Sequence, residues 1–255
     1  MSDAVASLSE DEFLGGKLRL KQPKHGHRAG HDAMLLAAAT PARAGERIVD
    51  LGAGVGAAGL AVASRINGID LVLVERDEDL VDIARANLAA NGLKGCAVAL
   101  DVVAGAAAFA AVGLGPDSVD RVLMNPPFND PSRHQASPDP MRRAAHEDDD
   151  DTLATWMRSV RRILKPAGTV SLIWRAEEIG RVLAALETGF GAPMVLPVYP
   201  RSDAAAIRIL VRATKGSRAP AALLPGIFLN GNTGRAPDDV QAVLEGKDVL
   251  PLAKP

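Results

Sequence analysis

Short apolar stretches alternate with longer helical ones through the middle of the chain, from about residue 47 to residue 214. The short stretches predict seven strands, namely RIVDL from 47, DLVLVE from 70, CAVAL from 96, RVLMN from 121, TVSLIW from 169, MVLPV from 194 and IRILVRA from 207. Strands that alternate with helices are typical of a parallel sheet covered on both faces. The pattern therefore predicts an α/β fold with a mostly parallel, Rossmann-like sheet of seven strands.

Two helical segments carry a clear apolar stripe. In residues 79–92 the stripe runs from Leu80 to Leu88 and stops at Gly92, a typical C-terminal residue of a helix. Residues 152–168 carry a similar stripe. Both segments are predicted to pack against the sheet.

The last two strands are joined by YPRSDAAA, which is too short for a helical crossover. They are therefore predicted to form a C-terminal antiparallel hairpin. We divide the chain into an N-terminal extension (1–46) that could contact substrate, a catalytic domain (47–214) and a C-terminal tail (215–255). The extension contains the helical stretch HDAMLLAAATPA, and the tail contains a short helix around PDDVQAVLEG.

Composition sets the broad class of protein. With 255 residues and 47% hydrophobic content the chain can bury one substantial core, and its net charge of −2 confines any phosphate-binding surface to local patches. The single cysteine, Cys96, excludes an intramolecular disulfide, and the acidic start lacks the features of a signal peptide. No apolar stretch is long enough to span a membrane. We expect a cytoplasmic protein.

A glycine-rich turn follows the first strand. VDLGAGVGAAGL (49–60) opens a helix, so that Gly52, Gly54 and Gly56 fall where the backbone turns tightly and approaches a ligand. Gly54, Gly56 and Gly59 also match G-x-G-x-x-G, and an acid ends the second strand. On this turn alone a nicotinamide-binding fold remains an alternative.

Polar residues mark the ends of four predicted strands. Asp50, Glu75, Asp101 and Asn125 would converge, because the carboxyl ends of parallel strands meet at one edge of the sheet. Our interpretation is that Glu75 accepts hydrogen bonds from ribose hydroxyls and Asp101 receives an adenine amine. Asp50 would help to hold the amino-acid end of the cofactor.

The fourth strand ends in NPPF, residues 125–128. Two prolines cannot sit inside a sheet ladder, so the chain must leave the sheet in a rigid turn. Together with DLGAGVG, Glu75 and Asp101, this turn resembles the class I S-adenosylmethionine-dependent methyltransferases that methylate planar amino nitrogens. The resemblance covers about residues 13–213.

The resemblance implies S-adenosylmethionine as cofactor and assigns catalytic roles to the turn. The Asn125 side-chain carbonyl and the Pro126 backbone carbonyl would accept the two hydrogens of the target amine. Phe128 would stack on its flat ring, and Pro127 would stiffen the turn. Two acceptors off the ring plane orient the amine lone pair toward the methyl group, and orientation can contribute about 7 to 11 kcal/mol in the best cases.

The N-terminal segment bears on the substrate. FLGGKLRLKQPKHGHRAGHDAMLLAAA (13–39) resembles the start of the bacterial tRNA adenine-N6 methyltransferases, and RRAAHEDDDDTL from 142 resembles their stretch after the catalytic turn. The family typically has Thr at the position of His31 and a bulky aromatic at that of Asn129. The implied activity is N-methylation of adenine N6 in tRNA or another structured RNA.

Four other functions remain open. A protein glutamine-N5 methyltransferase acting on release factors shares the NPPF turn, and methylation of another substrate is compatible with it. A nicotinamide oxidoreductase would satisfy the glycine spacing but not explain the turn. A non-catalytic RNA-binding module could have kept the cofactor pocket.

Two charged runs have competing interpretations. The basic run, made of Lys17, Arg19, Lys21, Lys24 and Arg28, could contact RNA phosphates or form the solvated face of a strand. For the acidic run EDDDD we predict that its residues cap the start of the following helix. No metal is expected, because the histidines lack matched ligand spacing.

Overall fold

The computed structural model describes residues 8–24, 28–126, 140–231 and 234–254, with 140–151 as backbone alone. Its centre is a nine-stranded sheet in which the seven predicted strands are consecutive in the order β5-β4-β3-β6-β7-β9-β8. These strands are β3 (Arg47–Leu51), β4 (Asp70–Glu75), β5 (Cys96–Ala99), β6 (Val119–Met124), β7 (Leu164–Arg175), β8 (Phe190–Tyr199) and β9 (Arg208–Lys215). Only β9 runs antiparallel to its neighbours β7 and β8, which confirms the predicted hairpin.

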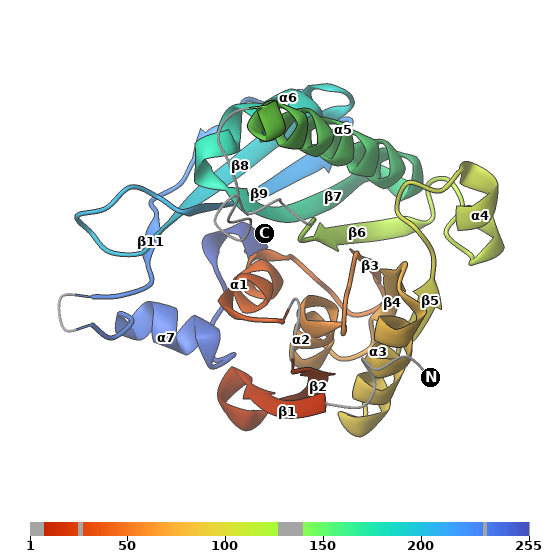
Figure 1. Ribbon diagram of the computed structural model, residues 1–255, viewed down its shortest axis with the longest axis horizontal. Helices are drawn as coiled ribbons and strands as arrows, with labels where there is room; N and C mark the ends of the chain where they lie inside the picture. Colours follow the sequence, from red (N-terminus) through yellow and green to blue (C-terminus); the bar gives the residue numbers. More distant parts are fainter. Residues whose placement is uncertain (1–7, 25–27, 127–139, 232–233, 255) are drawn as a thin grey trace.

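Helices cover both faces of the sheet (Figure 1). One face packs against α1 (His31–Ala39), α2 (Ala57–Arg65) and α3 (Glu78–Ala90), and the other against α4 (Ala106–Ala111), α5 (Pro140–Ile163) and α6 (Ile179–Glu187). In the described residues, short 3-10 helices lie at Leu14–Gly16, Ala176–Glu178 and Pro251–Ala253. The two apolar clusters meet the sheet from opposite sides, as expected for strands buried on both faces.

Helix α3 shows how the sequence sets its bounds. The Asp77 carboxylate accepts hydrogen bonds from the N–H groups of Asp79 and Leu80 and so caps the first turn. At the other end Gly92 has a φ of +63°, a left-handed conformation that ends the helix at low cost because glycine has no Cβ.

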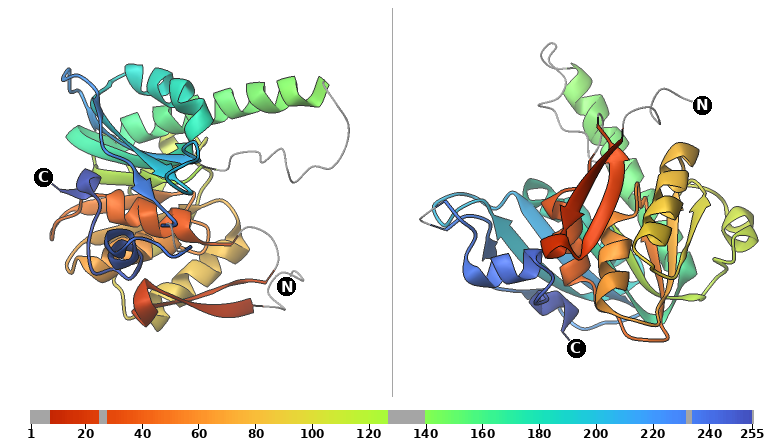
Figure 2. Two further views of the ribbon diagram at one scale, coloured as in Figure 1. Left: turned by 90° about the vertical axis from the view of Figure 1, so that its left-hand side faces the viewer. Right: turned by 90° about the horizontal axis from the view of Figure 1, so that it is seen from below.

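Helix α5 begins earlier than the sequence pattern predicts. It starts at Pro140 instead of near residue 152, so the acidic run 147–151 lies inside the helix. The prediction that these acids cap its start is therefore wrong. Upstream Met, Arg and Ala are good helix formers and proline is favoured at a first helical position, which explains the longer helix. Figure 2 shows α5 extending beyond the sheet.

An antiparallel hairpin precedes the sheet. It consists of β1 (Leu8–Phe13) and β2 (Leu18–Pro23). Along β2 the leucines Leu18 and Leu20 are fully buried, whereas Arg19 and Lys21 are exposed. This alternation is typical of a strand with one face on the core. The hairpin lies against α3, on the same side of the sheet as α1 and α2 (Figure 1).

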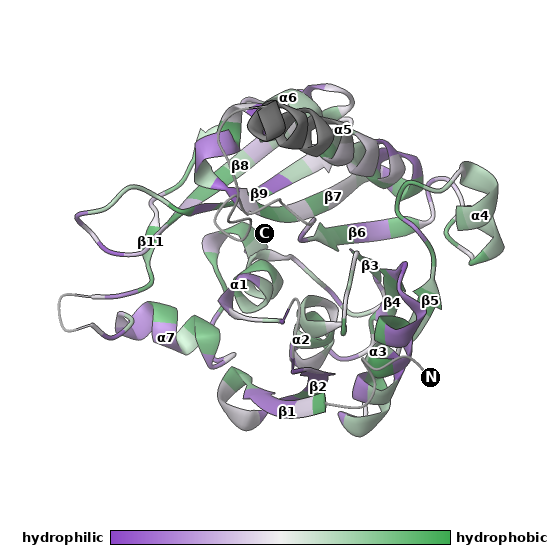
Figure 3. Ribbon diagram, viewed as in Figure 1, coloured by the Kyte–Doolittle hydropathy of each residue, from purple (hydrophilic) through white to green (hydrophobic). Residues whose placement is uncertain are grey.

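The C-terminal segment packs back onto the same core. The short strands β10 (Ala222–Leu223) and β11 (Ile227–Phe228) pair with β8 in parallel, which extends the sheet beyond the seven predicted strands. Helix α7 (Asp238–Leu244) packs on α1 through its buried valines, and hydrophilic and hydrophobic residues alternate along it (Figure 3). Among the described residues we find no helix with the length and apolar character that a membrane span requires.

Candidate active site

The glycine turn forms a tight loop at the carboxyl end of β3. Gly52, Gly54 and Gly56 all have positive φ, at +70°, +55° and +89°. The N–H groups of Gly52 and Ala53 donate to the Val74 carbonyl, at 2.8 and 2.9 Å, and so fasten the loop to the end of β4. The predicted glycine positions are therefore where the backbone requires glycine.

Two carboxylates accept hydrogen bonds from the backbone of the loop and of the helix that follows it. Asp50 Oδ2 accepts a hydrogen bond from the Gly59 N–H at 2.8 Å, and Glu75 Oε2 accepts one from the Gly54 N–H at 2.9 Å. Glu75 Oε1 accepts from the next two backbone N–H groups, at 2.8 and 3.1 Å. The Glu75 carboxylate is thus fixed beside the middle of the loop.

Asp101 lies next to Glu75 along this edge. The N–H of Leu100 donates to the Glu75 carbonyl at 2.8 Å, which brings the segment after β5 alongside the end of β4. Asp101 Oδ1 accepts from the Val103 N–H at 3.0 Å, so its carboxylate has a fixed direction. The two acids predicted to bind the nucleoside part of a cofactor are therefore neighbours.

Asn125 completes the edge on the other side of β3. In the β3–β6 pair Met124 stands opposite Leu51, so Asn125 leaves its strand beside the point where Gly52 leaves β3. The Asn125 Oδ1 atom is buried and has no hydrogen-bond partner within the part of the chain that the structure describes. Pro126 is buried as well. Pro127, Phe128 and Asn129 lie outside the described residues.

An unpaired buried carbonyl oxygen is unusual. Leaving such a group without a partner costs about 1 to 3 kcal/mol, and most buried polar atoms in native proteins are satisfied. A free acceptor beside a glycine loop is suited to a ligand that brings its own N–H donor. The structure thus gathers Asp50, Glu75, Asp101 and Asn125 at one edge of the sheet.

Asp50 has an unusual titration. Complete burial raises the pKa of its carboxyl to about 7; the Gly59 N–H acts in the opposite direction, and the negative charge of Glu75 raises the pKa further. The folded protein therefore holds a proton on Asp50 between about pH 4 and pH 7, whereas the unfolded chain has released it. Over that window stability falls as pH rises.

This titration gives a testable pH dependence. Asp50→Asn removes the ionisable group but keeps an oxygen that can accept from Gly59. In urea unfolding, the variant is expected to gain about 3 kcal/mol of stability relative to the wild type between pH 5 and pH 8, because about two pK units of the shift lie above pH 5. An unchanged difference between the two proteins at both pH values would contradict the assigned titration.

Asn87 of α3 joins the N-terminal hairpin to the glycine loop. It is fully buried; its Oδ1 accepts from the Lys21 N–H at 2.8 Å, and its Nδ2 donates to the carbonyls of Lys21 and Val55, both at 3.0 Å. One turn later Asn91 makes the same pair of bonds to Arg19 near the surface. Asn87 and Asn91 thus form hydrogen bonds with the backbone N–H and C=O groups of β2.

Asn87 is buried and Asn91 lies near the surface, so replacing each by alanine should change the free energy of unfolding by different amounts. Asn87→Ala leaves three backbone groups without this partner, of which the Val55 carbonyl is buried and the two of Lys21 are partly buried, and is expected to cost about 2 to 4 kcal/mol in the free energy of unfolding. Asn91→Ala is the matched control, and we expect less than about 1 kcal/mol because water replaces the lost bonds. Chemical denaturation measures both. Equal costs would show that Asn87 does not anchor the loop.

Acidic residues of β1 form ion pairs with two of the five cations of the basic run. Glu12 forms an ion pair with Arg19 at 3.0 Å, and Asp11 pairs with Arg28 at 2.7 Å. Glu10 stands directly opposite Lys21 in the hairpin register. These contacts favour the interpretation as a solvated strand face over that as a phosphate-binding surface.

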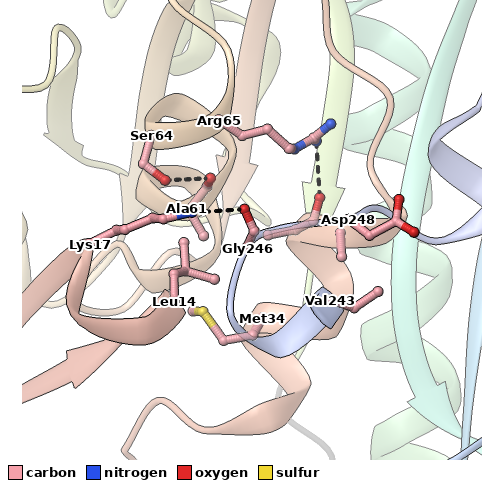
Figure 4. Close-up of a pocket in the computed structure, with 11 residues that line it drawn as sticks. Leu14, Lys17, Met34, Ala61, Ser64, Arg65, Val243, Gly246 and Asp248 are labelled. Carbon is pink, nitrogen blue, oxygen red and sulfur yellow. Dashed lines mark hydrogen bonds between the residues drawn. The ribbon is translucent and has the colours of Figure 1, made fainter. Parts of the chain in front are cut away.

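A cavity of about 270 Å³ lies away from this edge, between α1, α2, α7 and the hairpin turn. Figure 4 shows Lys17 donating to the Gly246 carbonyl, and Arg65 donating to a carbonyl of α1. None of the predicted site residues lines it. Within the part of the chain that the structure describes, no group of His, Cys, Asp and Glu could hold a metal ion.

Two residues of the site were not predicted from the sequence. Asn87 interrupts the apolar stripe of its helix, and a polar residue in such a stripe is a signal for a buried anchor. Trp156 of α5 packs under the loop so closely that a Cβ on Gly52 would overlap its ring. Trp156 looks like an ordinary core residue in the sequence, so nothing in the pattern indicates this contact.

Comparison with known proteins identifies the family. The family model of the methyltransferase small domain matches residues 28–195, which is more than half of the chain. The chain belongs to this family. It is an S-adenosylmethionine-dependent methyltransferase, as the resemblance of its glycine loop and NPPF turn implied.

The sequence similarity to known enzymes extends over most of the chain. The tRNA1(Val) (adenine(37)-N6)-methyltransferase of Bacteroides thetaiotaomicron is 29% identical over 73% of this chain and 76% of its own length. The enzyme of that name from Tolumonas auensis is 28% identical over 70% and 72%. A crystal structure described as a predicted O-methyltransferase from Agrobacterium tumefaciens has a TM-score of 0.73 and 29% identity, and covers 86% of this chain and 98% of the other.

The site of this methyltransferase fits its cofactor. A Cβ built on Gly54 meets no atom within 4 Å, so open space lies over the middle of the loop. A carboxylate, Glu75, stands beside that space, and the unpaired Asn125 oxygen belongs to the neighbouring strand end. This combination of open backbone, fixed carboxylate and free acceptor suits a nucleoside cofactor and an amine substrate.

Proposed function

We propose that the protein methylates N6 of adenine in RNA, with tRNA as its substrate. The observation that carries the proposal is the buried, unpaired Asn125 Oδ1 at the start of the Asn-Pro-Pro-Phe turn. An exocyclic amine offers the N–H donor that this oxygen lacks. The two relatives named as tRNA adenine-N6 methyltransferases support the same target.

The residues of the turn would act mainly by orientation. Bound S-adenosylmethionine supplies an electrophilic methyl group. Asn125 Oδ1 and the Pro126 carbonyl accept the two amine hydrogens and thereby direct the nitrogen lone pair out of the ring plane. Because the amine becomes acidic as it is alkylated, these acceptors and water can take its proton without a strong base.

The remaining residues would hold the cofactor and the base. Glu75 accepts hydrogen bonds from ribose hydroxyls, Asp101 receives the adenine amine of the cofactor, and Asp50 supports the loop near its amino-acid end. Phe128 stacks on the target base, which must be turned out of any paired or stacked region.

Label transfer tests this proposal. Incubation of the protein with radiolabelled S-adenosylmethionine and unmodified tRNA is expected to place label in N6-methyladenosine after nucleoside digestion. Ribonuclease treatment should remove the acid-precipitable label. Label that resists ribonuclease and appears in a release factor would overturn the RNA substrate and favour the glutamine-N5 alternative, because that enzyme class shares the same turn.

A further inference from the structure

A second cavity lies at the opposite edge of the sheet from the glycine loop. It measures about 300 Å³ and is lined mainly by Arg43, Arg121, Thr169, Arg212 and Thr214. These residues come from the loop before β3, the start of β6, and the adjoining ends of β7 and β9. A strand of five residues is about 16 Å long, so this cavity is separated from the loop by the length of β3.

The cavity has an excess of positive charge. Three guanidinium groups line it, and no aspartate or glutamate does so within the described part of the chain. Glu46 is the acid paired with one of these arginines: its carboxylate accepts hydrogen bonds from Arg121 Nη2 at 2.6 Å and Nε at 3.2 Å. Among the described residues, one carboxylate for three cations leaves two guanidinium groups without an acidic partner at the cavity.

Arg212 is held in this position without a carboxylate partner among the described residues. Its Nη1 donates to the carbonyls of Leu252 and Lys254, and its Nη2 contacts the Met194 sulfur. Burial and the nearby charge of Arg121 both lower the pKa of the Arg212 guanidinium. Two cations held close together in a half-buried site favour an anion between them.

Arg43 supplies unused donors at the mouth of the cavity. Its side chain is exposed and makes no hydrogen bond or ion pair with any described residue, although its backbone N–H is tied to Glu46 at 2.9 Å. Thr169 accepts from Arg121 at 3.0 Å, which leaves its hydroxyl hydrogen free to donate. Guanidinium forks and hydroxyls are the groups that bind phosphate oxygens.

We propose that this cavity is a binding site for a phosphate-type oxyanion, held between Arg43 and Arg212 with the threonine hydroxyls. The anion has two sources with the same chemistry. It is either a free anion such as inorganic phosphate or pyrophosphate, or a phosphodiester of a bound RNA. The site does not depend on which base or residue the enzyme methylates.

Calorimetric titration with phosphate and pyrophosphate tests the site. The wild type is expected to bind at least one of them, and Arg43→Gln is expected to weaken that binding by about tenfold or more through loss of a charge-assisted contact. Arg43→Gln should fold normally, because the side chain has no partner to lose. Arg218→Gln is the matched control, since Arg218 is exposed and lies outside the lining.

A parallel titration with tRNA distinguishes the two sources. If RNA supplies the phosphate, Arg43→Gln weakens tRNA binding more than Arg218→Gln does, and pyrophosphate competes with tRNA. If the anion is free, the two variants bind tRNA equally and differ only toward phosphate. Equal behaviour of Arg43→Gln and Arg218→Gln toward phosphate, pyrophosphate and tRNA overturns the proposal.

Discussion

Replacement of Asn125 by alanine is expected to reduce methyl transfer by about a hundredfold to a thousandfold while the protein stays folded. In the proposed mechanism the side chain supplies one of the two acceptors that orient the amine, and losing a preorganised polar contact of this kind typically costs a factor of about 10² to 10³. Its oxygen has no hydrogen-bond partner among the described residues, so no hydrogen bond to them is lost. Single-turnover transfer from labelled cofactor to tRNA measures the effect.

The free energy of unfolding of Asn125→Ala distinguishes this catalytic role from a structural one. Removing an unsatisfied buried carbonyl should leave the free energy of unfolding within about 1 kcal/mol of the wild type or raise it. Cofactor affinity should change little, because the acceptor faces the amine. An Asn125→Ala protein that unfolds easily but keeps its rate per folded molecule would show that the turn is only structural.

Gly52→Ala is expected to destabilise the fold by about 3 kcal/mol or more. Gly52 has a φ of +70°, where an L-residue with a Cβ is strained by about 1 to 2 kcal/mol. The new methyl group would also overlap the Trp156 ring, which is almost fully buried and has little room to move. Overpacking of this kind adds about 1 to 3 kcal/mol. Urea unfolding measures the total.

Gly54→Ala is the matched comparison two residues further on. Gly54 also has a left-handed backbone, with φ +55°, but an added Cβ meets only open space. We expect a cost near the backbone strain alone, about 1 to 2 kcal/mol, together with at least tenfold weaker binding of S-adenosylmethionine. Normal cofactor affinity in Gly54→Ala would show that the cofactor does not lie over this glycine.

The sequence was sufficient for the sheet because its strands are buried on both faces. Such strands are continuous apolar runs, and RIVDL and DLVLVE match β3 and β4 residue for residue. The positions of Gly52, Gly54 and Gly56 were predictable because a positive φ needs glycine. The side chains that hold the loop, such as Asn87, depend on contacts between distant segments that no local pattern contains.

The edges of the fold were harder to predict for the same physical reason. Strands β10 and β11 have two residues each and gain their pairing from β8, so they carry no periodicity of their own. The start of α5 depends on helix propensity, which is a weak signal over one or two turns. The basic run of the hairpin could be interpreted only when the register placed Glu10 and Glu12 opposite Lys21 and Arg19.

Mass analysis of tRNA nucleosides tests the central claim most directly. Cells that lack the gene should lose N6-methyladenosine from one tRNA. The wild-type gene should restore the modified nucleoside, and the Asn125→Ala gene, expressed at the same level, should not. An identical nucleoside profile in cells with and without the gene, or full restoration by Asn125→Ala, would contradict the account.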